Sequence, residues 1–175
     1  MQIVLIDFKR VNCAKKTAKI LSAELKVKTE FQKDGQNFIA SITGEGGSEW
    51  IAEQVIKAVN YGFDEKTALK LLSDEFFLDF VDLNASLWGK KKAIERYSAR
   101  IIGSEGKVRK TLEELTGAKI SVSEESVAII GDFDEIDAAK EAIHRILECR
   151  THETVYAFLE RLKQKREAKR LGAKL

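Results

Sequence analysis

Two glycines three positions apart, Gly103 and Gly106, stand between a pair of isoleucines and a basic segment. Glycine has no Cβ, so it adopts positive φ and lets another chain approach its backbone closely. Apolar residues recur at helical spacing over residues 107–116, which predicts a helix directly after the second glycine. The pair therefore predicts a tight turn at a helix N-terminus, where free N–H groups and the positive end of the helix dipole attract phosphate.

The segments on both sides of this turn predict a definite order of secondary structure. Alternating apolar and polar residues indicate strands, and apolar residues at helical spacing indicate amphipathic helices. Gly117 is suited to end the helix that follows the turn. The order is strand, helix, G-x-x-G turn, helix, strand, strand, helix. The predicted strands are residues 76–83, 118–122 and 127–130, and the predicted helices are residues 87–102, 107–116 and 133–147.

This order, with G-x-x-G between the first two helices, resembles the type I KH domain, a module that binds RNA or single-stranded DNA. In such domains the G-x-x-G loop clamps the backbone of about four unpaired nucleotides. The stretch from Arg96 to Gly106, followed by Thr111–Gly117, resembles one family more closely. These are the archaeal KH proteins related to the eukaryotic small-subunit assembly factor partner-of-NOB-one. Residues Thr154–Arg161 also resemble the C-terminal helix of that family.

The first half of the chain reads as a degenerate copy of the second. An internal repeat of about ninety residues predicts two tandem KH-like domains. The fold class is therefore α+β, with three-stranded antiparallel sheets covered by helices and a C-terminal helix. The expected elements of the first copy are strands 2–7, 26–31 and 38–43 and helices 13–25 and 50–61. The alignment pairs Leu21 with Leu112, Lys28 with Lys119, Phe31 with Val122, and Ile42–Gly44 with Ile129–Gly131.

The first copy departs from the KH pattern at the loop, where residues 12–15 read Asn-Cys-Ala-Lys in place of the glycines. It also has too few residues for the first KH helix. We therefore expect that this half does not clamp RNA in the KH manner. Its cations form either a solvated helix face, the favoured interpretation, or a nonspecific phosphate contact; they are Lys9, Arg10, Lys15, Lys16 and Lys19. The resemblance implies a third role, since degenerate KH domains in this family serve as protein-docking surfaces.

Three domains are predicted: residues 1–73 as the degenerate KH-like domain, 74–150 as the KH domain and 151–175 as a basic C-terminal helix. A short helical segment with Asp64 as its N-cap joins the halves. The C-terminal helix carries dense positive charge over residues 163–170, as either a solvated face or an RNA backbone contact.

The candidate RNA site centres on the glycine loop. Backbone N–H groups of residues 104–107 are expected to face phosphates, and nearby cations position the strand. The loop acid Glu105 opposes phosphate binding, although it favours a helix N-terminus. An apolar floor beneath the bases would come from Ile101, Ile102, Val108 and Ile120, for which core positions are the alternative. The predicted RNA-binding residues are Arg100, Ile102, Gly103, Ser104, Glu105, Gly106, Lys107, Arg109 and Lys110.

Composition limits the other classes of function. The net charge is only +2, so nucleic-acid binding has to come from local patches. No long apolar run or charged leader is present, and two cysteines without a spacing pattern fit a reducing cytoplasm. His144, Cys149 and His152 are too few for a zinc site. We find no catalytic constellation and expect neither a metal nor a cofactor.

The resemblance implies non-catalytic binding of single-stranded RNA, namely the precursor of small-subunit rRNA near its 3′ end. It also implies help to the endonuclease that trims this end during subunit assembly. The alternative is a protein-interaction adaptor, in which the KH folds dock that endonuclease or the alpha subunit of translation initiation factor 2, with RNA binding secondary. No membrane partner is expected.

Overall fold

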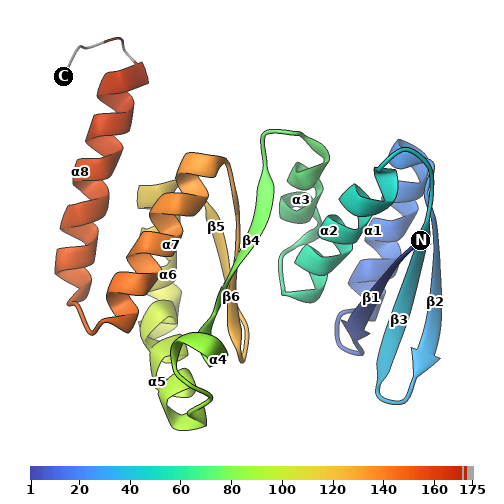
Figure 1. Cartoon of the computed structure of the whole chain (residues 1–175), viewed down its shortest axis with the longest axis horizontal. Helices are drawn as coiled ribbons and strands as arrows, with labels where there is room; N and C mark the ends of the chain where they lie inside the picture. Colours follow the sequence, from blue (N-terminus) through green and yellow to red (C-terminus); the bar gives the residue numbers. More distant parts are fainter. Residues whose placement is uncertain (171, 173–175) are drawn as a thin grey trace. The chain divides into compact units, whose positions relative to one another are not determined.

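The computed structural model describes residues 1–170 and 172. The chain divides into two compact units, Met1–Leu78 and Asp79–Leu175, which Figure 1 shows in sequence colours. Each unit is built on its own three-stranded sheet, with strand orders β1-β3-β2 and β4-β6-β5. This is the predicted α+β, KH-like architecture with two antiparallel sheets.

The second unit follows the predicted element order closely. Two of the predicted helices, 107–116 and 133–147, have the observed bounds. The predicted helix 87–102 is wrong at its start, because Trp88 and Gly89 adopt positive φ and separate a short first turn from the main helix. The elements are β4 (Phe77–Asp82), α4 (Leu83–Ser86), α5 (Lys91–Ile102), the 3₁₀ turn η2 (Ser104–Gly106), α6 (Lys107–Thr116), β5 (Lys119–Val122), β6 (Ser126–Gly131), α7 (Phe133–Leu147) and α8 (His152–Arg170).

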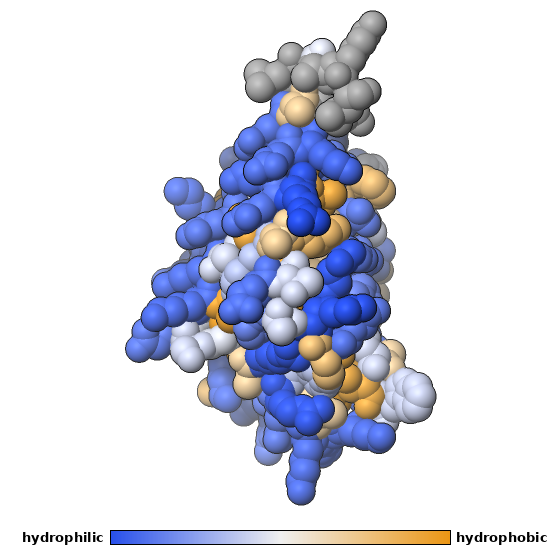
Figure 2. Space-filling view, turned by 90° about the vertical axis from the view of Figure 1, so that its left-hand side faces the viewer, coloured by the Kyte–Doolittle hydropathy of each residue, from blue (hydrophilic) through white to orange (hydrophobic). Residues whose placement is uncertain are grey.

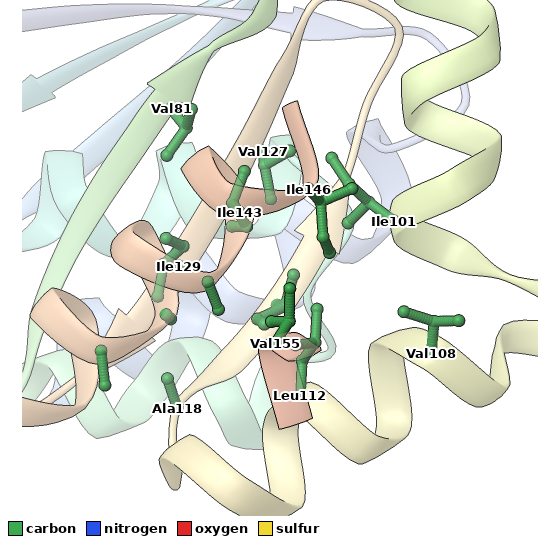
Figure 3. Packing of buried hydrophobic residues seen from close by; sticks show 14 of the residues in the cluster. Val81, Ile101, Val108, Leu112, Ala118, Val127, Ile129, Ile143, Ile146 and Val155 are labelled. Atoms are coloured by element: carbon green, nitrogen blue, oxygen red, sulfur yellow. The ribbon is translucent and has the colours of Figure 1, made fainter. Parts of the chain in front are cut away.

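The core of the second unit is aliphatic and lies between the sheet and its helices (Figure 3). Ile101, Val108 and Ile120, three of the four residues considered for an apolar floor, belong to this core. For these three residues the core alternative therefore holds. Full burial of such a side chain contributes about 1.5–3 kcal/mol, so these residues hold the helices that carry the loop in place. Only Ile102 of the four is exposed, at 37%.

The C-terminal helix α8 packs on the second unit. Val155 and Leu159 are fully buried in its core. Burial raises the pKa of the Tyr156 phenol, and a hydrogen bond with Thr111 of α6 opposes that shift. The outward side of α8 is mostly hydrophilic (Figure 2), with Lys163 and Lys165 exposed. The predicted helix extended to residue 175; residues 171 and 173–175 lie outside the described part.

The first unit contains the same sheet with fewer helices. Its short connecting helix begins as predicted, because the Asp64 carboxylate accepts a hydrogen bond from the Thr67 N–H at 3.3 Å. The Thr67 hydroxyl donates to the same carboxylate at 2.6 Å, and this hydrogen bond is the main reason why the pKa of Asp64 is lowered. The elements are β1 (Gln2–Asp7), α1 (Val11–Leu25), β2 (Lys28–Asp34), β3 (Asn37–Thr43), α2 (Ser48–Asn60), α3 (Glu65–Ala68) and the 3₁₀ turn η1 (Leu69–Leu72).

The strand registers of the two units agree residue by residue with the predicted repeat. Lys28 lies opposite Thr43, as Lys119 lies opposite Ile130. At the other end of the shared segment, Phe31 lies opposite Ala40 and Val122 opposite Val127. The repeat is therefore structural, and it establishes which positions of the two units are equivalent.

The units differ between the first strand and the helix that follows it. In the first unit only Phe8, Lys9 and Arg10 connect β1 to α1. In the second unit the same connection holds α4, α5 and the glycine loop. The first KH helix is thus absent from the first unit, as the sequence predicted.

Candidate nucleic-acid interface

The two positions of the loop are occupied by glycine for different structural reasons. Gly103 has φ +71°, and a Cβ there would stand 2.3 Å from Cγ2 of Val108. No other residue fits that position, because Val108 is part of the core. Gly106 has φ +75°, but a Cβ there would meet no atom within 4 Å. The backbone at Gly106 therefore faces open space, where a phosphate can approach it.

Two backbone amides of the turn donate hydrogen bonds within the turn itself. The Gly106 N–H donates to the Gly103 carbonyl at 3.2 Å, and the Lys107 N–H donates to Ser104. Among the described residues, the amides of Ser104 and Glu105 have no such partner, and no side chain caps α6. Two of the four expected amides, together with the N-terminal end of α6, thus remain for an anion.

Glu105 adopts a left-handed conformation, with φ +53°, and its side chain is exposed. Left-handed backbone is unfavourable for a residue other than glycine, asparagine or aspartate. The loop therefore presents its acid to solvent at the apex, between the two glycines.

A groove runs beside the loop along α5. Its walls are α5 and the turn between β5 and β6, and Ile102 lies where the groove meets the loop. This side chain is the one predicted site residue in the groove lining. The other lining residues include Lys91, Glu95, Ser98, Ala99, Val122, Glu124 and Glu125.

Two polar side-chain atoms of the second unit are buried without a hydrogen-bond partner in the described part of the chain. One is Oγ of Ser98, which lines the groove, and the other is Nε of Arg109. Arg109 lies one turn before Glu113, whose carboxylate accepts from the Ile120 N–H of β5 at 2.8 Å. Residues four apart share a helix face, so Arg109 is directed toward the β5 side of α6. Buried polar groups normally have partners, so these two atoms are exceptions within the second unit.

The remaining predicted cations divide into two groups. Lys107 and Lys110 are exposed at the start of α6, three positions apart on one face. Arg100 instead donates from Nη1 to the carbonyl of Ile146 at 3.3 Å and from Nη2 to the carbonyl of Arg150. Its guanidinium therefore holds the turn between α7 and α8, which argues against a role as a phosphate ligand.

The groove itself is acidic. The carboxylates of Glu95, Glu124 and Glu125 line it, against the single cation Lys91 in the same lining. A phosphate backbone inside this groove meets repulsion, whereas the Lys107–Lys110 edge attracts it. Carboxylates also accept hydrogen bonds from exocyclic base amino groups. The arrangement thus favours a strand whose backbone follows the loop and α6 and whose bases enter the groove.

Sequence reasoning missed the groove residues of α5 and the β5–β6 turn. The helix at 87–102 and the strands at 118–122 and 127–130 that flank the turn were predicted, but nothing in one sequence states that the helix and the turn face each other. Ser98 had one available signal: it lies one helical turn before Ile102 and shares its face.

Metal and membrane sites find no support in the described residues. No three or more His, Cys, Asp or Glu side chains there come together in a way that could hold a metal ion. His152 points Nε2 at the carbonyl of Arg100, 3.2 Å away, and stacks on Tyr156. None of the described helices combines the length and hydropathy that a membrane span requires.

A βααββα unit with a three-stranded antiparallel sheet and a glycine turn between its first two helices defines a type I KH domain. The chain belongs to this family: residues 77–164 match the family model for the second domain of Pno1, described as eukaryotic type KH-domain (KH-domain type I).

Relatives and solved structures agree with this assignment. A KH domain-containing protein of Methanocaldococcus jannaschii is 38% identical over 149 residues, which cover 84% of this chain and 65% of that protein. The pre-rRNA-processing protein pno1 of Emericella nidulans is 30% identical over 108 residues, 59% of this chain and 41% of the relative. The chain thus spans less than two thirds of the length of these relatives.

Two crystal structures match nearly the whole chain. A protein of unknown function from Aeropyrum pernix has a TM-score of 0.83 at 28% identity, covering 98% of this chain and 96% of that one. A chain in the a/eIF2alpha–aDim2p–rRNA complex from Pyrococcus horikoshii has a TM-score of 0.81 at 28% identity, covering 94% of both chains.

Proposed function

We propose that this protein binds single-stranded RNA without catalysis, through residues 74–150. The observation that carries the proposal is the turn at Gly103–Gly106, which leaves two amides and the start of α6 open beside a groove. The RNA backbone lies along the loop and is held by Lys107, Arg109 and Lys110. Ile102 and Ser98 face the bases.

The RNA is the precursor of small-subunit rRNA, bound near its 3′ end in the cytoplasm. The support is family membership and the pre-rRNA-processing name of the fungal relative. The rRNA in the Pyrococcus horikoshii complex supports the same ligand class. In this role the protein presents the RNA end to an endonuclease, and the chemistry belongs to that enzyme.

An adaptor function is the second candidate. The Pyrococcus horikoshii complex contains a/eIF2alpha beside rRNA, which supports the alpha subunit of translation initiation factor 2 as a protein partner. The endonuclease contact rests on the family resemblance alone. In the adaptor function, binding of these proteins persists when the RNA loop is disabled.

The test is RNA binding by a loop variant of the full chain, Ser104→Asp with Glu105→Asp, measured by fluorescence anisotropy with short single-stranded RNAs. Both positions are exposed, so the fold should be retained. Added negative charge at the phosphate site should weaken binding about tenfold or more. The matched control adds the same charge in the connecting segment, Ser73→Asp with Glu75→Asp, where both positions are exposed. Unchanged affinity of the loop variant would remove the loop from the site.

A further inference from the structure

The turn between α4 and α5 of the second unit (Figure 1) carries a tryptophan and three lysines. Trp88 is 81% exposed and is the most exposed of the large apolar side chains that the structure describes. Such exposure is unusual, because tryptophan is largely buried in most folded proteins. Lys90, Lys91 and Lys92 are also exposed, and none of them forms an ion pair within the described part of the chain. We call these four residues the tryptophan–lysine turn.

The tryptophan and the lysines are both locally unfavourable where they stand. Trp88 has φ +57°, in the left-handed region that bulky side chains avoid. Helix α5 begins with lysines and has no acid in its first turn, although the positive end of a helix dipole repels cations. The turn is nevertheless held in place, because the Gly89 N–H donates to the Asn84 carbonyl at 2.9 Å. Residues that break local rules in this way are concentrated at functional sites.

The tryptophan–lysine turn lies at the end of the groove that is farthest from the glycine loop. Lys91 and Ile102 line the groove at the two ends of α5. The rise from one to the other is about 16 Å at 1.5 Å per residue. Trp88 precedes Lys91 by three residues, so their Cα atoms are at most about 11 Å apart. The groove therefore leads from the loop to this turn.

The charges along the groove favour a strand that continues beyond it. Inside the groove the carboxylates of Glu95, Glu124 and Glu125 repel phosphates, whereas Lys107 and Lys110 attract them at the loop end. The tryptophan–lysine turn places a second group of cations at the opposite end. A nucleotide that leaves the groove there meets positive charge and an exposed aromatic ring together.

The length of the groove determines which nucleotide reaches the turn. A KH loop clamps about four unpaired nucleotides. A stacked strand advances about 3.4 Å per nucleotide, and further where its bases separate, so four nucleotides occupy most of a groove of about 16 Å. The next nucleotide therefore emerges beside Lys91.

We infer that the tryptophan–lysine turn is a subsite for the nucleotide beyond the clamped four, whose base stacks on Trp88 and whose phosphate is held by the three lysines. Stacking on an aromatic ring beside cations binds unpaired bases with little sequence preference. The inference rests on the proposed function of the glycine loop, and it extends the RNA that the second unit recognises. The second unit thus prefers strands longer than about four nucleotides.

The dependence of affinity on strand length tests this subsite in the full chain. With oligoadenosine strands, lengthening from about four to seven nucleotides should raise the affinity of the wild type at least about fivefold more than that of Trp88→Leu. Trp88→Phe keeps a ring and should keep most of the rise. Phe133→Leu is the matched control, because Phe133 is 77% exposed at the start of α7 and lies outside the groove lining.

Tryptophan fluorescence reports the stacking directly. The chain has two tryptophans, and Trp50→Phe leaves Trp88 as the only one. In this variant an oligoadenosine strand of about eight nucleotides should quench the emission. The same strand with abasic residues on both sides of its central four bases keeps the phosphates and should quench much less.

Equal length dependence in the wild type and Trp88→Leu, or equal quenching by the two strands, overturns the inference. Either result leaves the proposed function intact, because the shortest strand reports the glycine loop alone. The Ser104→Asp, Glu105→Asp variant separates the two proposals, since it should weaken binding of strands of every length. If that variant binds all of them as the wild type does, the proposed loop site fails, and this inference fails with it.

Discussion

The two units each contain a three-stranded sheet of the same topology, and they differ in the connection between the first strand and the helix that follows it. Their strand orders and registers are the same, and Leu21 and Leu112 are both fully buried at equivalent positions. Yet the equivalent of the exposed loop residue Glu105 is Ala14, which is fully buried in a regular helix. Register and core thus preserve the fold after the loop chemistry has been lost. The segment between the first strand and the helix after it decides what each unit can bind.

Gly103→Val should give the largest difference between the units. The clash with Val108 and the positive φ should destabilise the second unit by about 3 kcal/mol or more. Asn12→Val at the equivalent position, where α1 is regular and the side chain is exposed, should cost less than about 1 kcal/mol. Thermal unfolding followed by circular dichroism measures both. Equal losses would show that the loop is not a rigid part of the second unit.

Arg100→Ala tests whether this cation belongs to the fold or to the RNA site. Loss of its hydrogen bonds to the carbonyls of Ile146 and Arg150 should lower the stability of the second unit by about 2 kcal/mol. Arg100→Lys should be destabilised too, since lysine cannot reach both carbonyls in the same way. The structural role is contradicted if Arg100→Lys is as stable as wild type and only the Ala variant loses RNA affinity.

Asn12→Gly with Lys15→Gly restores the glycine spacing in the first unit. Two glycines in the first turns of α1 should cost about 1 kcal/mol in total. RNA affinity should not increase, because the unit still lacks the helix that forms the groove wall. The comparison is made in the Ser104→Asp, Glu105→Asp background, with Asn12→Ala, Lys15→Ala as the control. A gain in affinity would mean that glycine spacing alone creates a clamp.

Neutralising groove acids should give the smallest effect. Glu124→Gln with Glu125→Gln removes repulsion of phosphate and should tighten binding of a uridine strand by about two- to fivefold at low salt. The gain should shrink as salt is raised. Asp74→Asn with Glu75→Gln, two exposed acids of the connecting segment, controls for net charge. A loss of affinity instead would show that the carboxylates hold bases directly.

The sequence predicted the elements well where local signals agree. Helices 107–116 and 133–147 have their predicted bounds, because glycine ends the first and a capping box between Asp132 and Glu135 begins the second. The break at Trp88 and Gly89 was missed, since a tryptophan in left-handed conformation has no sequence signature. Register also followed from the repeat, because a slip by one residue would turn every buried side chain outward.

The candidate site was less predictable from sequence. The glycine loop and its lysines were identified from local pattern, but Arg100 has the same local pattern and faces the end of α7. Which face of a helix meets which strand depends on packing between distant segments. For that reason Ile101, Val108 and Ile120 remained ambiguous until the core was seen, and Ser98 gained its place in the groove only in three dimensions.

The two unpaired donors, Ser98 Oγ and Arg109 Nε, lower the unfolding free energy of the free protein. A buried donor without a partner costs about 1–3 kcal/mol, so the unliganded second unit is less stable than its core alone implies. A ligand of the groove binds the folded unit and not the unfolded chain. By mass action it also raises the unfolding free energy, by about 2.7 kcal/mol at a hundred times Kd. The melting temperature of the second unit therefore reports occupancy of its groove.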